Sequence, residues 1–243
     1  MRQAVIIVAG GSGTRMGGDI PKQFLPIKGV PVLIHTILAF RRAMPNLEVV
    51  LVLPKLSHDF WDKILVDILD ELGPDKHLLN DICVAEGGEN RFSSVKNGLA
   101  KLVHFSDDDF IAIHDGVRPF VSAEVIHRCF QIVVDTKAVV PVVPVVDSLR
   151  RLIGNDVSSM NQTTIISDSQ SIIRAEYVSV QTPQVFGVSV LRHAYLQAFD
   201  SRFTDDASVV EAAGTKVSLV LGNEENIKLT TQKDMYLAEL LTP

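Results

Sequence analysis

Short apolar runs alternate with longer amphipathic segments along most of the 243-residue chain. The apolar runs are typical of strands covered on both faces. In the amphipathic segments apolar residues recur every three or four positions, which is typical of helices packed on a core. The expected strands are 4–9, 48–54, 81–86, 110–115 and 138–143, and the expected helices lie within 33–40, 60–72, 95–103 and 125–133. This alternation predicts an α/β fold with a mostly parallel sheet and right-handed crossovers.

The same pattern returns near the end of the chain. We expect helices near 190–199, 205–213 and 232–241, and a strand at 216–222. A chain of this length can bury one core without disulfides or metals. The sequence therefore predicts a single domain, residues 1–243, with a Rossmann-like three-layer α/β/α architecture.

The alternation breaks between about 144 and 177. This polar stretch has no apolar helical stripe and is longer than an ordinary connection. It contains three β-rich pieces, SLRRLI, TTIIS and SIIR, around turn residues 154–156. We interpret it as a β-arm inserted in the α/β domain, and a mobile surface loop is the alternative.

Composition narrows the possible functions. The chain is 47% hydrophobic and 21% charged, which excludes a disordered or fibrous protein. Its net charge of -6 offers no general basic surface for nucleic acid or anionic lipid. Cys83 and Cys129 lie far apart inside apolar stretches, so no CxxC pair or disulfide framework is available. The apolar run at 4–9 is too short for a signal peptide, and we expect a soluble, cytoplasmic protein.

The segment 8–24, VAGGSGTRMGGDIPKQF, directly follows the first expected strand. Its early glycines allow a sharp turn that brings backbone N–H groups close to an anion. Arg15 and Lys22 follow, and two cations around such a loop suit a triphosphate whose charge grows as pyrophosphate leaves. The alternatives are a loop that only serves backbone geometry and two solvated surface cations.

Two familiar nucleotide-binding loops do not fit this segment. A Walker A loop needs GKS or GKT after four spacer residues, which this chain lacks. A Rossmann GxGxxG loop needs glycine where Met16 stands, and an acidic residue at the end of the second strand, where Pro54 stands. The glycine loop is therefore of another kind.

Several motifs follow one another along nearly the whole chain: AGGSGTRM with PKQF, EGGENRFSSVKNGL, HDGVRPF, QTPQVF, TDDASVVE and ENIKLT. Together with the Arg15 to Lys22 spacing, they resemble the nucleotidyltransferases of sugar and polyol phosphates, and within these the 2-C-methyl-D-erythritol 4-phosphate cytidylyltransferases. The resemblance implies a fold of the nucleotide-diphospho-sugar transferase type. It also implies transfer of CMP from CTP to 2-C-methyl-D-erythritol 4-phosphate, with release of pyrophosphate, in the non-mevalonate isoprenoid pathway.

Two other functions stay open. Ribitol 5-phosphate cytidylyltransferases share the glycine loop, PKQF and QTPQ. They are expected to have one more residue between the arginine and the lysine, and TDAC in place of TDDAS. A non-catalytic nucleotide-binding protein on the same fold is the second alternative, and the presence of Arg15, Lys22, Asp115 and Lys228 disfavours it.

The resemblance implies that CTP lies along the glycine loop and that the acceptor phosphate attacks its α-phosphate in line. Arg15 and Lys22 would be the catalytic residues, acting by position and charge. The loop GGENR would bind and recognise the cytosine. Without the resemblance, a turn that opens a helix is an equally good interpretation of GGENR. Glu89 stands where members of the family often have aspartate. The implied CTP-binding residues are Ala9, Gly10, Gly11, Gly13, Gly88, Glu89 and Ser94.

The resemblance also implies a divalent cation, Mg²⁺, held by Asp115. This residue ends an apolar strand, at the edge where open α/β sheets bind ligands, and one or two carboxylates usually hold Mg²⁺ beside phosphate oxygens. A helix N-cap is the alternative role. Glu225 stands where the family has a second aspartate, and Arg118 is interpreted as a structural partner of Asp115. The histidines show no HExxH spacing, which argues against zinc.

Three residues match the family's acceptor-binding positions: Lys228, Arg174 and Ser148, the last standing where threonine is usual. In this family the arm crosses to a second subunit. Arg174 and Ser148 would therefore complete the neighbour's site in a homodimer.

Overall fold

The computed structural model describes residues 1–10, 20–68, 72–154, 160–161 and 163–242. Within these residues eight strands form one sheet. At its centre β1 (Gln3–Val8) lies between β6 (Phe110–Asp115) and β4 (Glu48–Leu53), parallel to both, and β5 (Ile82–Glu86) continues the parallel order beyond β4. The predicted strands are therefore present with nearly the expected bounds.

The other half of the sheet is mixed. β11 (Gln184–Gly187) runs antiparallel between β6 and β7 (Ala138–Pro144). β7 also pairs with β10 (Val178–Val180), antiparallel, and with β12 (Ser218–Leu221), parallel. β10 and β11 are not predicted from the sequence, because both are short and β11 begins inside the motif QTPQVF.

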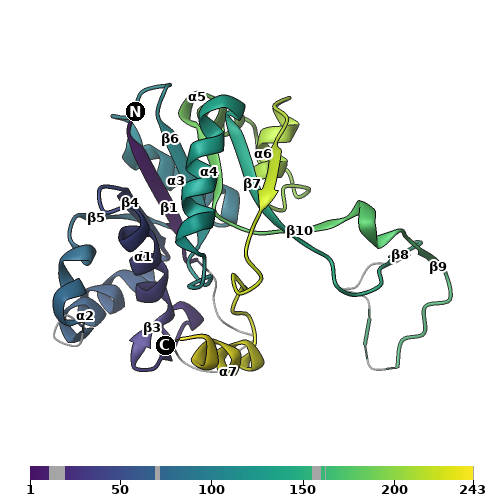
Figure 1. Ribbon diagram of the computed structural model, residues 1–243, viewed down its shortest axis with the longest axis horizontal. Helices are drawn as coiled ribbons and strands as arrows, with labels where there is room; N and C mark the ends of the chain where they lie inside the picture. Colours follow the sequence, from purple (N-terminus) through teal and green to yellow (C-terminus); the bar gives the residue numbers. More distant parts are fainter. Residues whose placement is uncertain (11–19, 69–71, 155–159, 162, 243) are drawn as a thin grey trace.

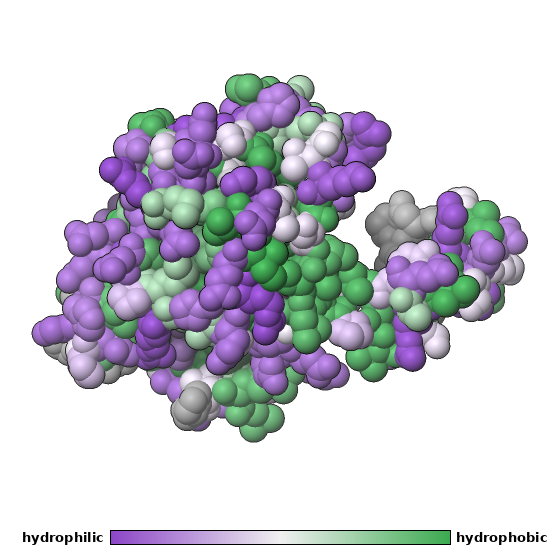
Figure 2. Space-filling model, turned by 45° about the horizontal axis from the view of Figure 1, so that its top comes forward, coloured by the Kyte–Doolittle hydropathy of each residue, from purple (hydrophilic) through white to green (hydrophobic). Residues whose placement is uncertain are grey.

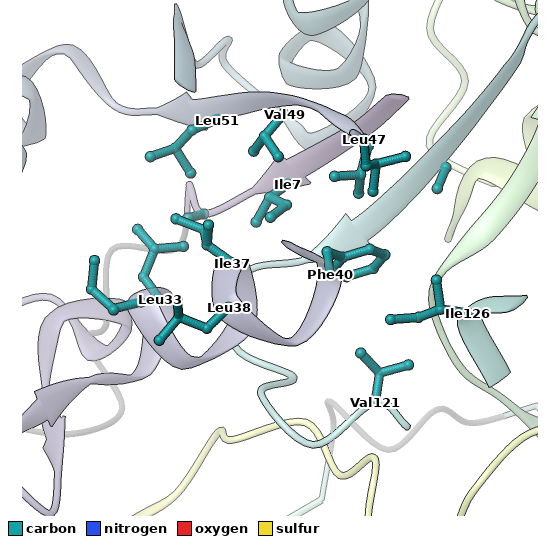
Figure 3. Packing of buried hydrophobic residues seen from close by; sticks show 14 of the residues in the cluster. Ile7, Leu33, Ile37, Leu38, Phe40, Leu47, Val49, Leu51, Val121 and Ile126 are labelled. Carbon is teal, nitrogen blue, oxygen red and sulfur yellow. The ribbon is translucent and has the colours of Figure 1, made fainter. Parts of the chain in front are cut away.

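Helices cover both faces of this sheet (Figure 1). One face carries α1 (Val32–Ala43), α2 (His58–Ile68) and α4 (Ala123–Thr136), and the other carries α3 (Arg91–Leu99), α5 (Val188–Ala194) and α6 (Asp206–Ala212). Strand residues alternate between the two cores: Ile7 packs with the first group of helices and Ile6 with the second. Figure 3 shows Ile37 and Phe40 of α1 in the first core, beside Ile7. The fold is the predicted three-layer α/β/α architecture.

A small subsidiary layer closes one end of the molecule. The hairpin of β2 (Pro26–Ile27) and β3 (Val30–Pro31) packs with the C-terminal α7 (Gln232–Leu241) around buried Ile27 and Leu229. Short 3-10 helices lie at Lys22–Phe24, Lys55–Ser57, Gly73–Leu79, Ala100–Leu102 and Arg174–Glu176. Among the described residues, none of the helices has both the length and the apolar character needed to cross a bilayer.

The segment expected to form an arm extends away from the sheet (Figure 1). β8 (Arg150–Leu152) pairs antiparallel with β9 (Ser169–Ser171) there, and the Arg150 guanidinium donates to Ser169. The piece TTIIS, at 163–167, contains no strand, so that part of the prediction is wrong. Residues 155–159, which include two of the predicted turn residues, lie outside the described part of the chain.

The predicted helix at 190–199 is also shorter than expected. α5 ends at Ala194, and Tyr195 then turns inward, where its hydroxyl donates to Asp206. Leu196 and Phe199 are exposed.

Candidate active site

A cleft of about 290 Å³ opens where β1 and β6 end, at the carboxyl edge of the parallel strands. This is the edge at which open α/β sheets bind ligands. A hollow of about 500 Å³ lies at the opposite edge, around Arg2, Asn46 and His127, but none of the predicted site residues lines it. The first cleft is lined by Val8, Ala9, Gly10, Lys22, Gln23, Gly88, Glu89, Asn90, Arg91, Ser94, Asp115, Val117 and Lys228.

Eight of the residues chosen from the sequence therefore line one cleft: Ala9, Gly10, Lys22, Gly88, Glu89, Ser94, Asp115 and Lys228. Gly11, Gly13 and Arg15 lie outside the described residues. Ser148 and Arg174 are exposed in the projecting segment and do not line the cleft within one chain.

Asp115 is buried at the floor of the cleft and is surrounded by cations. Its Oδ2 lies 3.0 Å from Lys228 Nζ and 3.2 Å from Arg118 Nε, and its Oδ1 lies 3.7 Å from Arg91 Nε. Burial alone raises the pKa of this carboxyl group, but Arg91, Lys228 and Arg118 outweigh burial and hold the pKa well below its usual range. Asp115 is thus an ionised carboxylate, and Arg118 is its partner as predicted.

Hydrogen bonds from β6 to the QTPQ segment fix the backbone at Asp115. His114 Nε2 lies 3.0 Å from the Arg118 carbonyl oxygen, which can only accept, so Nε2 carries the proton. Nδ1 then accepts from the Thr182 hydroxyl at 3.0 Å, and the Thr182 oxygen accepts from the Asp115 N–H at 3.1 Å. Burial lowers the pKa of His114 to about 4, which keeps the ring neutral.

The loop GGENR does open a helix, and it also lines the cleft. Asn90 caps α3 by accepting from the Ser93 N–H at 2.8 Å. The Ser94 hydroxyl donates to the Asn90 carbonyl at 2.8 Å and accepts from the Gly88 N–H at 3.0 Å. A Cβ at Gly88 would lie only 2.4 Å from Ser93 Cβ, so the turn requires glycine. Because the Gly88 N–H is occupied, its carbonyl is the backbone group left for a ligand.

Gln23 connects the lysine motif to the first strand. Its side chain is 1% exposed, and its Nε2 donates to the Ala9 carbonyl oxygen at 2.9 Å. This bond holds the 3-10 helix that carries Lys22 against the start of the glycine loop. PKQF is one of the motifs that carry the resemblance, but this role of Gln23 is not predicted from the sequence.

The ENIK segment is anchored through a buried asparagine. Asn226 donates from Nδ2 to the Thr182 carbonyl at 2.8 Å, and the backbone carbonyl of Asn226 accepts from the Arg118 guanidinium at 2.7 Å. Two residues later Lys228 reaches the cleft. Glu225 does not line the cleft, and its carboxylate accepts from Asn223 instead.

Sequence reasoning missed Arg91 as a cleft residue. Its Nη2 lies 2.6 Å from Oδ2 of Asp206, which is fully buried, and its Nε faces Asp115. Both residues belong to motifs that carried the resemblance, GGENR and TDDAS. However, no spacing in the sequence indicates that residues 115 positions apart form a pair.

Comparisons with known proteins agree along the whole chain. The family profile described as 2-C-methyl-D-erythritol 4-phosphate cytidylyltransferase matches residues 3–242. The enzyme of that name from Bacteroides thetaiotaomicron is 48% identical over 241 residues, which are 99% of this chain and 100% of the relative. Its namesake from Bacteroides fragilis is 49% identical over 242 residues, with the same coverage. The crystal structure of the Thermus thermophilus enzyme has a TM-score of 0.72 and 31% identity, covering 99% of this chain and 98% of that one.

The fold and the relatives together define an enzyme of the nucleotidyltransferase class. The chain belongs to the family of 2-C-methyl-D-erythritol 4-phosphate cytidylyltransferases, which act in isoprenoid biosynthesis. The family assignment favours methylerythritol phosphate as acceptor over ribitol 5-phosphate, and an enzyme over a non-catalytic binding protein.

Proposed function

We propose that the cleft beside Asp115 is where this chain transfers CMP from CTP to 2-C-methyl-D-erythritol 4-phosphate. One observation carries the proposal: Lys22, Asp115, Lys228 and the GGENR loop, far apart in sequence, line one cleft at the carboxyl edge of the sheet. The chain as a whole has a net charge of -6, so this concentration of cations is local. It suits an anionic substrate pair.

The reaction needs no protein nucleophile. A phosphate oxygen of the acceptor forms a bond to the α-phosphorus of CTP, and the bond from that phosphorus to the bridging oxygen breaks. Pyrophosphate leaves with the electron pair. Negative charge grows on the phosphate oxygens, so the work of the protein is positioning and charge stabilisation. We assign that work to Lys22 and to Arg15, which lies outside the described residues.

The cytosine is assigned to the loop that opens α3. Gly88 offers its carbonyl oxygen, and Ser94 has one lone pair left after accepting from Gly88 and donating to Asn90. Both are acceptors, which suit the exocyclic amino group of cytosine and disfavour the carbonyl at the same position in uracil. Glu89, in the same loop, lines the cleft beside Gly88 and is assigned to the nucleotide as well. Ala9, Gly10, Gly11 and Gly13 are assigned to the glycine loop along which CTP lies.

Asp115 is suited to be the one protein ligand of a Mg²⁺ ion. It is an ionised carboxylate at the cleft, and among the described residues the ion-pair contact of its Oδ1 is the one to Arg91, at 3.7 Å. In the described part of the chain no three His, Cys, Asp or Glu side chains gather as a metal site. Substrate phosphates and water would therefore supply the other ligands, as is usual for Mg²⁺. When bound, such an ion neutralises phosphate charge during the transfer.

The acceptor phosphate is assigned to Lys228 of one chain and to Arg174 and Ser148 of a second copy. Arg174 and Ser148 are exposed in the projecting segment and do not line the cleft of their own chain. Val146, Ile173 and Tyr177 of this segment are exposed, as are Val178 and Val180 of β10. Figure 2 shows hydrophobic side chains gathered between this segment and the body of the molecule. Exposed apolar surface of this kind is typical of an interface, here of a homodimer.

We propose further that residues 1–243 form one domain, that 144–177 is its dimerisation arm, and that the enzyme is cytoplasmic. No nucleic acid or membrane partner is expected.

Thermal-shift measurements test the nucleotide assignment. CTP with Mg²⁺ should raise the melting temperature, whereas ATP, GTP and UTP at the same concentration should raise it much less, because only binding to the folded state stabilises it. Equal shifts for all four nucleotides would contradict the assignment of cytosine to the GGENR loop.

A further inference from the structure

A buried ionic network lies behind the cleft and takes no direct part in the proposed transfer. Asp206, in the first turn of α6, is fully buried. Its Oδ2 lies 2.6 Å from Arg91 Nη2, and its Oδ1 accepts the Tyr195 hydroxyl at 2.6 Å. Burying a carboxylate is costly unless it is paired and hydrogen-bonded. Asp206 meets both conditions, since it is paired with Arg91 and hydrogen-bonded by Tyr195.

Arg91 connects this network to the cleft, which it lines. Its contact with Asp206 is short, whereas its Nε lies 3.7 Å from Asp115 Oδ1, beyond hydrogen-bond reach. Burial lowers the pKa of Arg91, but Asp206 and Asp115 outweigh it and raise the pKa. Burial and Asp206 both raise the pKa of Tyr195, which keeps its hydroxyl a neutral donor. A charged guanidinium is therefore held on Asp206, in ion-pair contact with Asp115 but beyond hydrogen-bond distance from it.

The two oxygens of Asp115 differ in consequence. Lys228 and Arg118 both bind Oδ2, at 3.0 and 3.2 Å. Within the part of the chain that the structure describes, the cation facing Oδ1 is Arg91, at 3.7 Å. Oδ1 is therefore the oxygen with room for another partner.

We propose that Arg91 is a positioning residue, which Asp206 and Tyr195 hold away from Asp115 so that Oδ1 stays open to the cleft. The inference rests on the proposed role of Asp115 in binding a divalent cation. Without the negative charge of Asp206, the guanidinium keeps Asp115 as its remaining carboxylate partner among the described residues, and it closes onto Oδ1. Arg91 then competes with the cation instead of leaving room for it.

Asp206→Asn tests this, because it removes the charge but keeps the size and an acceptor for Tyr195. The matched control is Asp205→Asn at the neighbouring position. Asp205 caps α6 through Oδ1 and accepts from Gln184 through Oδ2, so the asparagine, with one amide oxygen, keeps the cap and loses the bond from Gln184. We expect Asp206→Asn to raise the Mg²⁺ concentration for half-maximal activity about tenfold or more, as is typical when a group that orients a metal ligand is lost. We expect Asp205→Asn to stay near wild type.

Calorimetric titration with CTP supplies a readout that does not depend on turnover. With Mg²⁺ present, Asp206→Asn should bind CTP about tenfold more weakly than wild type, whereas in EDTA the two should agree within about twofold. Tyr195→Phe, which removes one hydrogen bond and leaves the charge, should shift the Mg²⁺ dependence in the same direction by less. It also decides the question if Asp206→Asn does not fold.

The outcomes are distinct. An unchanged Mg²⁺ dependence in Asp206→Asn and Tyr195→Phe, with an active wild type, overturns the role of Arg91 alone. Equal loss of CTP binding with Mg²⁺ and in EDTA also overturns it, since a merely structural defect gives that result. A wild type that does not turn over CTP overturns the proposed function and this inference with it.

Discussion

Lys228 Nζ lies 3.0 Å from Asp115 Oδ2. Lys228, assigned to the acceptor phosphate, and Asp115, assigned to the divalent cation, therefore form an ion pair at the floor of the cleft. The Lys228 side chain is 43% exposed and that of Asp115 is 10% exposed. Lys228 is therefore the partner that can turn toward an incoming phosphate, whereas the strand and its hydrogen bonds fix Asp115.

Lys22→Ala should lower kcat by about a hundredfold or more, with a smaller change in the KM for CTP, because it removes a charge placed for the transition state. Steady-state pyrophosphate release measures both constants. Lys63→Ala, on the exposed face of α2, is the control and should behave as wild type. A kcat for Lys22→Ala within about threefold of wild type would rule out the catalytic role.

Gly88→Ala should weaken CTP binding while the fold is retained. The added Cβ would lie 2.4 Å from Ser93 Cβ, so the loop that carries the Gly88 carbonyl must shift. Gly87→Ala is the control, because its Cβ would meet only contacts of 3.4 Å or more. Calorimetric titration with CTP compares the two variants. Equal affinity in both would show that the Gly88 turn does not contact the nucleotide.

Asp234→Ala should destabilise the protein by about 1 kcal/mol at pH 7, because it removes one half of the capping box that Thr231 and Asp234 form at the start of α7. Asp234 Oδ2 accepts from the backbone N–H groups of Thr230 and Thr231, at 2.7 and 2.8 Å. Burial raises the pKa of Asp234, but these bonds outweigh it and lower the pKa.

A lowered pKa in the folded state gives stability that is present above the unfolded pKa of about 3.9 and is lost as pH falls below it. The difference in melting temperature between wild type and Asp234→Ala should therefore be constant near neutral pH and narrow below about pH 4. Asp62→Ala, an exposed aspartate of α2, controls for the general effect of acid. A difference that stays constant down to about pH 3 would exclude the capping explanation.

Lys22→Ala and Arg174→Ala should each be nearly inactive alone and should restore activity when their subunits are exchanged. In a mixed dimer one site carries both substitutions and the other carries neither. Random exchange makes about half the dimers mixed, so about a quarter of all sites should work. A monomeric elution profile, or no recovery after complete exchange, would refute a site shared between two subunits.

Most of the sheet and of the helices could be predicted from the sequence, because buried parallel strands and amphipathic helices leave strong periodic patterns. β1, β4 and β6 are long apolar runs of this kind. β10 and β11 are not, because each is short and is defined by its pairing with β7 or β6, which local pattern does not record. The wrong prediction at TTIIS has the same cause. Its β-branched residues favour a strand, but they have no partner strand among the described residues.

The candidate site divides in a similar way. Residues at strand ends or in glycine loops, such as Asp115 and Gly88, carry a local signal of their role. Arg91 and Asp206 carry none, since each is an ordinary charged residue in a helix until the fold brings them within 2.6 Å. The residues that hold a site in place are mostly defined by tertiary contacts of this kind, and these are hard to foresee from one sequence.

Acceptor-dependent release of pyrophosphate from CTP tests the central claim most directly. Purified protein is incubated with CTP, Mg²⁺ and either 2-C-methyl-D-erythritol 4-phosphate or ribitol 5-phosphate, and pyrophosphate is measured with a coupled assay. We predict release that requires both CTP and the methylerythritol phosphate, is far slower with ribitol 5-phosphate, and is nearly abolished by Lys22→Ala. Release that is independent of the acceptor, faster with ribitol 5-phosphate or undiminished in Lys22→Ala would contradict cytidylyl transfer to methylerythritol phosphate at this cleft.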